Sequence, residues 1–150
     1  MKNNIVLKTV MMGILVAGCG NQVAPGGKVV AHAGTPAGAP NVELQTRAGT
    51  PYVRVQDVDF SLKTTWNKPA KDDFQMVEVL TPDGHLYLRK ELPVGADGVV
   101  DLHVLVAGTY IQDFSMTGTW TARFFRNVAD APAQEFSFQI LDGELAVAKP

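Results

Sequence analysis

A chain of 150 residues has room for one domain, and its 46% hydrophobic and 19% charged residues are typical of a folded protein rather than a disordered one. The formal net charge is −2, and loss of residues 1–18 would remove Lys2 and Lys8 and leave 11 basic against 15 acidic residues. This acidic balance gives no electrostatic basis for nucleic-acid binding, so we expect no nucleic-acid partner. The single cysteine, Cys19, excludes an internal disulfide, so packing alone must hold the fold.

Residues 1–18 have the layout of an export signal. Lys2 and Lys8 supply positive charge, and Thr9–Gly18 forms a short apolar core that ends on small residues. As a helix, these 10 residues span only ~15 Å, which is half of the ~30 Å hydrocarbon core of a bilayer. We therefore expect no permanent transmembrane span.

The stretch Leu15-Val16-Ala17-Gly18-Cys19 resembles the lipobox of bacterial lipoprotein signal peptides, in which aliphatic and small residues precede an acceptor cysteine. The resemblance implies cleavage before Cys19, a diacylglyceryl thioether on its sulfur and acylation of the new N-terminus. Two or more acyl chains suffice for stable membrane anchoring. Gly20 stands where an Asp would retain such a protein at the inner membrane, which favours the outer membrane. The alternative is an ordinary secretory signal peptide in which Cys19 is incidental.

Residues 19–40 are expected to comprise the lipidated cysteine and a flexible tether. The segment holds five glycines and three prolines and few large apolar side chains, so it cannot offset the entropy lost on ordering. As a coil, the 21 residues of Gly20–Pro40 span on the order of 25 Å, and about 70 Å when fully extended.

From residue 41 onward, short runs of alternating apolar residues between turn residues predict β-strands, and 41–150 is expected to be one domain. The expected strands are 42–46, 53–62, 74–80, 85–91, 100–106, 118–125 and 135–140. The alternation slips near Gln56-Asp57, which indicates a β-bulge within the second strand. Residues 107–118 are expected to form a long connection, in which Tyr110, Ile111 and Phe114 are apolar enough to pack.

Thr81-Pro82-Asp83-Gly84 predicts a tight turn, since Pro fixes φ and Asp-Gly tolerates a positive φ. The strand that follows should place Leu86 and Leu88 inward and Tyr87 and Arg89 outward. The strand spacing favours an all-β fold, an antiparallel β-sandwich of about seven strands after a signal peptide and a tether.

The end of the chain resembles the final hairpin of bacterial immunoglobulin-like and fibronectin-III-like modules. The similarity lies in Gly118-Thr119-Trp120-Thr121-Ala122-Arg123-Phe124 and in Phe136-Ser137-Phe138, and the strand count extends it to 42–141. It implies an immunoglobulin-like sandwich. The chain departs from antibody domains in lacking their cysteine pair and in placing the tryptophan of this motif, Trp120, late in the chain.

No catalytic, metal-binding or cofactor-binding constellation stands out in the sequence. The three serines, Ser61, Ser115 and Ser137, lie outside any nucleophile-elbow motif. His85 and His103 could approach each other across a sheet, but zinc needs three or four converging ligands. The aspartates at 57, 59, 72 and 73 lack the ligand series of an EF-hand calcium site. We therefore expect no enzyme activity, no cofactor and no metal.

One outward surface is a candidate for binding a partner. Phe125 opposes the phase of the core aromatics of its strand, so it either lies exposed beside Arg123 or is shielded at an edge. Tyr87 and Arg89 are further candidates on the preceding hairpin. Both alternatives for Phe125 stay open.

These observations predict a non-enzymatic envelope protein, held by acyl chains on Cys19, whose sandwich binds another protein of unknown identity. The alternative is a tethered module that binds a carbohydrate or a small ligand under the 107–116 loop. That alternative requires Trp66 and Tyr110 to face solvent and lie coplanar. A plain surface spacer is not separable from the protein-binding hypothesis by sequence.

Overall fold

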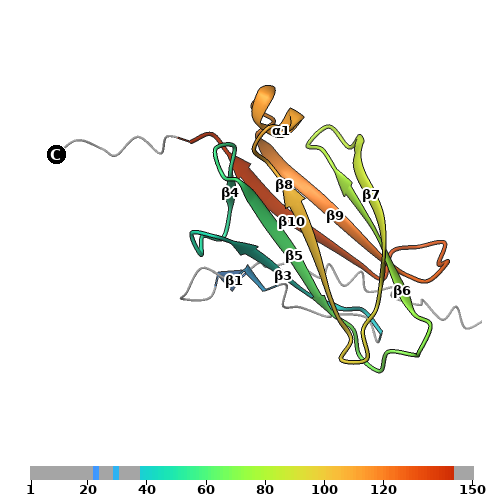
Figure 1. The fold of residues 1–150 in the computed structure, drawn as a ribbon. Helices are drawn as coiled ribbons and strands as arrows, with labels where there is room; N and C mark the ends of the chain where they lie inside the picture. The colour runs from blue at the N-terminus through green and yellow to red at the C-terminus, as the bar shows by residue number, and fades with distance from the viewer. Residues whose placement is uncertain (1–21, 24–28, 31–37, 144–150) are drawn as a thin grey trace, which may run out of the picture.

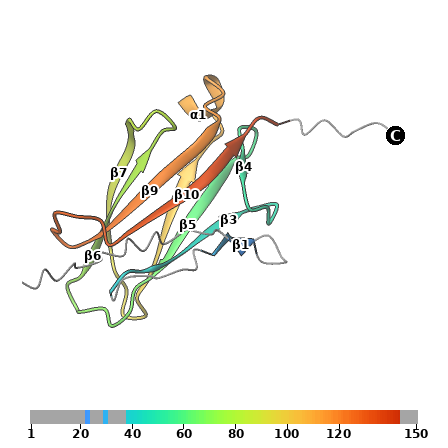
Figure 2. The same cartoon turned by 180° about the vertical axis from the view of Figure 1, so that it is seen from behind.

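The computed structural model describes residues 22–23, 29–30 and 38–143, and the described chain is almost entirely β-structure (Figures 1 and 2). This confirms the all-β expectation. The elements in chain order are β1 (Gln22–Val23), β2 (Val29–Val30), β3 (Asn41–Thr46), β4 (Val53–Arg54), β5 (Asp59–Thr65), β6 (Phe74–Leu80), β7 (Leu86–Pro93), β8 (Val99–Leu105), α1 (Tyr110–Asp113), β9 (Gly118–Arg126) and β10 (Gln134–Leu141).

The strands form two sheets packed face to face. Sheet A has the order β1-β2-β3-β5-β8, and sheet B has the order β4-β10-β9-β6-β7. Sheet B curls as a half-barrel over sheet A (Figures 1 and 2). All pairs of neighbouring strands are antiparallel except β4 and β10, which run parallel. The expectation of a purely antiparallel arrangement therefore needs this correction.

The core lies between the sheets and is built by the alternation seen in the sequence. In β8, Val100, Leu102 and Val104 are buried while the residues between them are exposed. In β10, Phe136, Phe138 and Ile140 are buried in the same way. A slip of one residue would turn this apolar face to solvent, so the pattern excludes such registers. The core also takes in Phe60, whose ring centroid lies 5.2 Å from that of Phe138.

The expected bulged strand 53–62 is wrong, because these residues form two strands in different sheets. β4 pairs with β10 in sheet B, whereas β5 pairs with β3 and β8 in sheet A. The chain crosses between the sheets where the alternation slips. Asp57 closes this crossing, since its Oδ2 accepts a hydrogen bond from the Arg54 N–H at 2.8 Å and its own N–H donates to the Arg54 carbonyl at 3.0 Å.

The tight turn between β6 and β7 forms as expected, with Gly84 at φ +80° and its N–H donating to the Thr81 carbonyl at 2.8 Å. The facing of β7 differs from the prediction at two positions, because the register shifts between Val79 and Leu80. Tyr87 faces inward and packs edge-on against Trp120, with ring centroids 5.2 Å apart, whereas Leu86 is exposed. A bulge adds one residue and so reverses the facing beyond it.

The long connection after β8 contains the one-turn helix α1. Thr109 caps it, because its side-chain oxygen accepts from the Ile111 N–H at 3.3 Å. Ile111 is fully buried in the core. Its burial fixes the loop to the end of the sandwich and leaves the neighbouring aromatic residues outside.

Part of the predicted N-terminal region lies outside the described residues, including residues 1–18 and Cys19. Within the expected tether, β1 pairs with β2, and β2 pairs with β3 in the register Val29↔Leu44. Within the described ranges, no helix has both the length and the apolar character needed to cross a bilayer.

Candidate functional site

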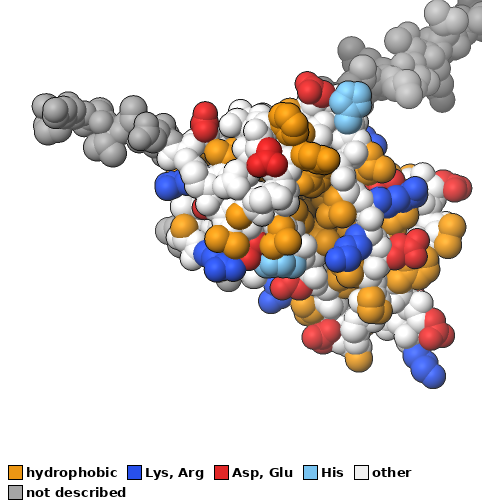
Figure 3. Space-filling view, turned by 45° about the horizontal axis from the view of Figure 1, so that its top comes forward, with side chains coloured by type: hydrophobic (Ala, Val, Ile, Leu, Met, Phe, Trp, Pro, Cys, Tyr) orange, Lys and Arg blue, Asp and Glu red, His pale blue; other side chains and the backbone are white. Residues whose placement is uncertain are grey.

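Exposed apolar side chains gather at one end of the sandwich, where β8 leads into α1. We call this surface the apolar end and define it by Val58, Leu86, Leu105, Tyr110, Phe114 and Met116. Figure 3 shows hydrophobic side chains grouped on this face and continuing into a hollow. Among the described residues, only Val128 is a large exposed hydrophobic residue outside this surface. Such clustering is typical of an interaction surface rather than of scattered exposed residues.

The loop around α1 positions the most exposed members of the apolar end. Tyr110 and Phe114 are 67% and 71% exposed, and their ring centroids lie 5.7 Å apart. They flank buried Ile111, so the same turn that anchors the loop turns both rings outward. With Met116 they line an open apolar hollow of about 440 Å³.

The base of the apolar end is held by contacts to both sheets. The Trp120 Nε1–H donates to the Met116 carbonyl at 3.0 Å, which ties the end of the loop to β9. Gly118 lies against the β6–β7 turn, since a Cβ at this position would meet Pro82 at 3.0 Å. These contacts bring Leu86 of β7 to the same end as α1, although the two are separated by more than twenty residues of chain.

The loops that form the apolar end carry formal charge of one sign. The loops that form it, 55–58, 81–85 and 106–117, contain Asp57, Asp83 and Asp113 and no Lys or Arg. The apolar end is therefore an aromatic and aliphatic surface whose loops carry acidic residues. A partner surface with apolar residues bordered by Lys or Arg would match it in both respects.

The candidate surface predicted from the sequence is arranged differently. Arg123 lies on the outer face of sheet B, but Phe125 beside it is only 7% exposed and stands next to Met76 of β6 in the strand register. Of the two alternatives for Phe125, the structure shows the shielded one. Tyr87 is partly buried and packs against the core, as described above.

Arg89 and Arg123 belong to a row of alternating charges across sheet B. The register places Arg89 of β7, Glu78 of β6, Arg123 of β9 and Glu135 of β10 side by side. Arg89 Nε lies 3.5 Å from Glu78 Oε1, and Arg123 Nε lies 2.8 Å from Glu135 Oε1. Cross-strand pairs of opposite charge stabilise a sheet. Both arginines therefore have a structural role on this face.

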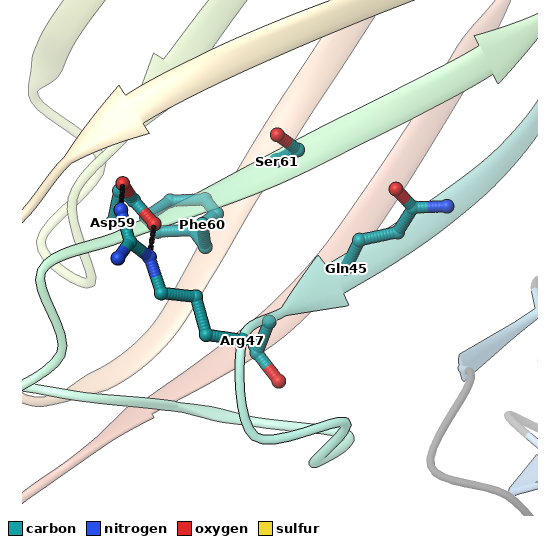
Figure 4. A pocket seen from close by; sticks show the side chains of 6 residues that line it. Gln45, Arg47, Asp59, Phe60 and Ser61 are labelled. Atoms are coloured by element: carbon teal, nitrogen blue, oxygen red, sulfur yellow. Dashed lines mark hydrogen bonds and ion pairs between the residues drawn. The ribbon is translucent and has the colours of Figure 1, made fainter.

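A second polar cluster lies on the outer face of sheet A. Arg47 bends back over the start of β5 and binds both oxygens of Asp59, at 2.7 and 2.6 Å (Figure 4). The Arg47 guanidinium lowers the pKa of the Asp59 carboxyl below its usual range. His103 Nε2 lies 3.3 Å from Asp59 Oδ2, and Ser61 Oγ lies 3.5 Å from His103 Nδ1.

Ser61, His103 and Asp59 thus lie in a row across β5 and β8. Sequence reasoning missed this arrangement. The cause is the strand register, which pairs Ser61 directly with His103. Two features disfavour nucleophilic catalysis here. Asp59 is already neutralised by Arg47. The cluster borders a shallow hollow of about 210 Å³ on the outer face of paired strands, where the backbone N–H groups serve the sheet and not a developing oxyanion.

The other residues considered for catalysis or metal binding are dispersed. His85 lies in the β6–β7 turn of sheet B, whereas His103 is in sheet A, so the two histidines do not meet. Ser137 is exposed on β10, and Ser115 follows α1. Within the described part of the chain, no three potential metal-ligating side chains come together.

The opposite end of the domain is closed by a buried polar network. Asp73 accepts hydrogen bonds from Asn127 Nδ2 at 2.9 Å, from the Ala70 N–H at 2.8 Å and from Arg126 Nε at 3.0 Å. These donors, Asn127 first, lower the pKa of Asp73 to about 2. Trp66 is buried at the same end, with its Nε1–H donating to Gln75 Oε1 at 2.8 Å. Trp66 and Tyr110 therefore do not form the coplanar platform that a carbohydrate site would need.

No protein-family model matches the chain, and the curated proteins contain no match to it.

Proposed function

We propose that this chain is a bacterial lipoprotein, anchored in the envelope by acyl chains on Cys19 and favouring the outer membrane, whose β-domain binds another protein through the apolar end. The observation that carries the binding proposal is the clustering of exposed Tyr110 and Phe114 with the other apolar side chains of that end. Aromatic residues and Met are enriched where proteins bind one another. The anchor rests on the Leu15–Cys19 motif.

The arrangement of the strands suits a tethered binding domain. The strand register places Asn41 beside Thr65, and Thr65 beside Val99, at the end of sheet A where the domain begins. The apolar end follows Leu105, at the other end of the same strands. An anchor attached through the N-terminal segment therefore leaves the apolar end free for a partner.

We further propose an immunoglobulin-like topology for the domain. Two packed sheets support it, as does the β9–β10 hairpin, in which Trp120 stands opposite Phe138 and Ala122 opposite Phe136. The parallel pairing of the short β4 with β10 shows the chain moving from one sheet to the other near its start.

The binding proposal is tested with the full chain and two variants. The double variant Tyr110→Ser with Phe114→Ser removes both exposed rings, and the control Val128→Ser removes the exposed side chain outside the apolar end. We expect capture of a partner from envelope extracts by the unaltered chain and by the control, with loss of the same protein from the double variant. Equal capture by all three chains would refute binding through the apolar end.

The anchor is tested separately by Cys19→Ser. We expect loss of metabolic labelling with a radioactive fatty acid and release from the membrane fraction. A variant that stays in the membrane would show that residues 1–19 were misinterpreted.

The open hollow beside Phe114 also favours, as a second candidate, binding of a small apolar ligand. An apolar fluorescent probe should then bind the unaltered chain and not the double variant. Capture of a protein that competes with the probe would assign the hollow to the protein partner instead.

A further inference from the structure

The two sheets have four edge strands among the described residues, and three of them are poorly suited to pairing with another chain. β1 and β4 are only two residues long, and β7 contains the bulge, Lys90 and Pro93. Bulges, lysines, prolines and short length are the features that protect sheet edges from association. The fourth edge, β8, has seven residues in unbroken register with β5 and none of these features.

We propose that β8 pairs with β8 of a second copy of this chain, antiparallel and centred on Leu102, to join two A sheets into one. The sequence of β8 complements itself about this residue. Val100 would face Val104 of the other copy, Asp101 would face His103, and Val99 would face Leu105. Two of these pairs are apolar, and Asp101 can accept a hydrogen bond from His103 of the other copy once the imidazole exchanges its contact with Asp59 or Ser61. Every pair occurs twice because of the two-fold symmetry.

The observed exposures agree with this arrangement. Asp101, His103 and Leu105 are exposed on the outer face of β8, whereas Val100, Leu102 and Val104 are already buried against sheet B. Pairing would therefore add backbone hydrogen bonds and cover Leu105 without disturbing the core. Any other antiparallel register loses the match, since a shift by two residues places His103 opposite His103 or Asp101 opposite Asp101.

The pairing covers Leu105 but leaves the exposed rings of the apolar end, Tyr110 and Phe114, accessible in both copies. Because α1 follows β8 directly, an antiparallel pair directs the two α1 loops to opposite ends of the joined sheet. The proposal goes beyond partner binding and does not depend on it.

The register is tested by cysteine mixing in the full chain carrying Cys19→Ser. Directly opposed Cα atoms in antiparallel strands lie ~5 Å apart, within the range of a disulfide, whereas position 101 lies ~8 Å from its own symmetry mate. We expect Asp101→Cys and His103→Cys to form a disulfide-linked dimer when mixed, and neither to do so alone. Lys90→Cys, on the β7 edge, is the control for disulfides that form by random collision between chains. Equal cross-linking by all preparations would overturn the proposal.

A second measurement uses no cysteine. The mass of the Cys19→Ser chain in sedimentation should be that of a dimer that dissociates on dilution. Asp101→Lys places a cation opposite His103 and should shift the chain to monomer, whereas Glu91→Lys on β7 should not, and both should keep their β-sheet circular dichroism. A chain that is monomeric at every concentration, or equal masses for the two variants, would refute pairing through β8.

Discussion

Asp73 shows how one side chain can join two distant loops. It receives its hydrogen bonds from Ala70 in the loop before β6 and from Arg126 and Asn127 at the end of β9. A buried carboxylate is stable only when such partners replace the water it loses. These partners favour the charged form, which is the physical reason for its lowered pKa.

The first prediction concerns the acid stability given by Asp73. Its pKa falls from 3.8 in a free side chain to about 2 in the fold, so the charged form stabilises the fold above pH ~4. This contribution is lost as the pH falls from ~4 through ~2. In thermal unfolding, Asp73→Asn should lower the midpoint at pH 7, and its difference from the unaltered chain should shrink toward pH 2. Asp72→Asn, at the exposed neighbouring position, is the control, and a pH-independent difference would contradict the assignment.

The second prediction concerns the Ser61–His103–Asp59 cluster. A serine nucleophile needs a histidine whose positive charge is stabilised by a free carboxylate, but Arg47 binds both oxygens of Asp59. We therefore expect no labelling of Ser61 by a fluorophosphonate, as measured by mass spectrometry of the intact chain. Arg47→Ala should leave the chain equally unlabelled, because no oxyanion site accompanies the cluster. Stoichiometric labelling that His103→Ala abolishes would instead indicate a hydrolase.

At the scale of elements, the sequence predicted strands wherever one face of a strand is buried. The alternation in 74–80 and 100–106 identified β6 and β8 closely, because a buried face needs every second residue to be apolar. It failed at 53–62, where apolar residues on either side of a turn continue an apparent alternation. The strand pairing shows that the chain changes sheet there, at the turn closed by the hydrogen bonds of Asp57.

The apolar end was only partly predictable for a similar reason. Tyr110, Ile111 and Phe114 were all expected to pack, but one helical turn can direct only one of these three side chains into the core. A single turn has no periodicity that would show which one. Leu86 was expected inward, and the bulge that turns it outward has no sequence signature in the Asp83-Gly84 turn.

The third prediction follows from the different positions of Ile111 and Tyr110. Ile111→Ala removes a fully buried side chain and should lower the free energy of unfolding by about 2–4 kcal/mol. Tyr110→Ala, one residue earlier and exposed, should change it by no more than about 0.5 kcal/mol. Urea unfolding of both variants measures the two values. Equal destabilisation would mean that α1 is not anchored through Ile111.

The fourth prediction concerns the turn that connects the two sheets after β7. Gly98 has φ +76°, and a Cβ there would lie 2.2 Å from the Trp66 carbonyl oxygen. Gly98→Ala therefore requires the backbone to shift at the point where the Trp66 N–H donates to the Gly98 carbonyl. We expect a loss of several kcal/mol in unfolding free energy. Gly108→Ala, also at positive φ but with open space around it, is the matched control and should cost less.

For the whole molecule, the two ends of the sandwich differ in character. The end where β3 begins is closed by the polar network of Asp73 and Arg126, and the opposite end carries exposed aromatic rings. The strands of both sheets run between these ends. A domain built in this way separates its point of attachment from its proposed contact surface by the full length of the strands.

The placement of β3 has a mechanical consequence. If the chain is pulled at Asn41 while a partner holds the apolar end, the load runs along β3 and β5. Their hydrogen bonds lie across the direction of pull, so all rungs from Asn41↔Thr65 to Thr46↔Phe60 resist together in shear rather than opening one at a time. The domain should therefore withstand tension along this axis better than a pull that separates β3 from β5 one rung at a time.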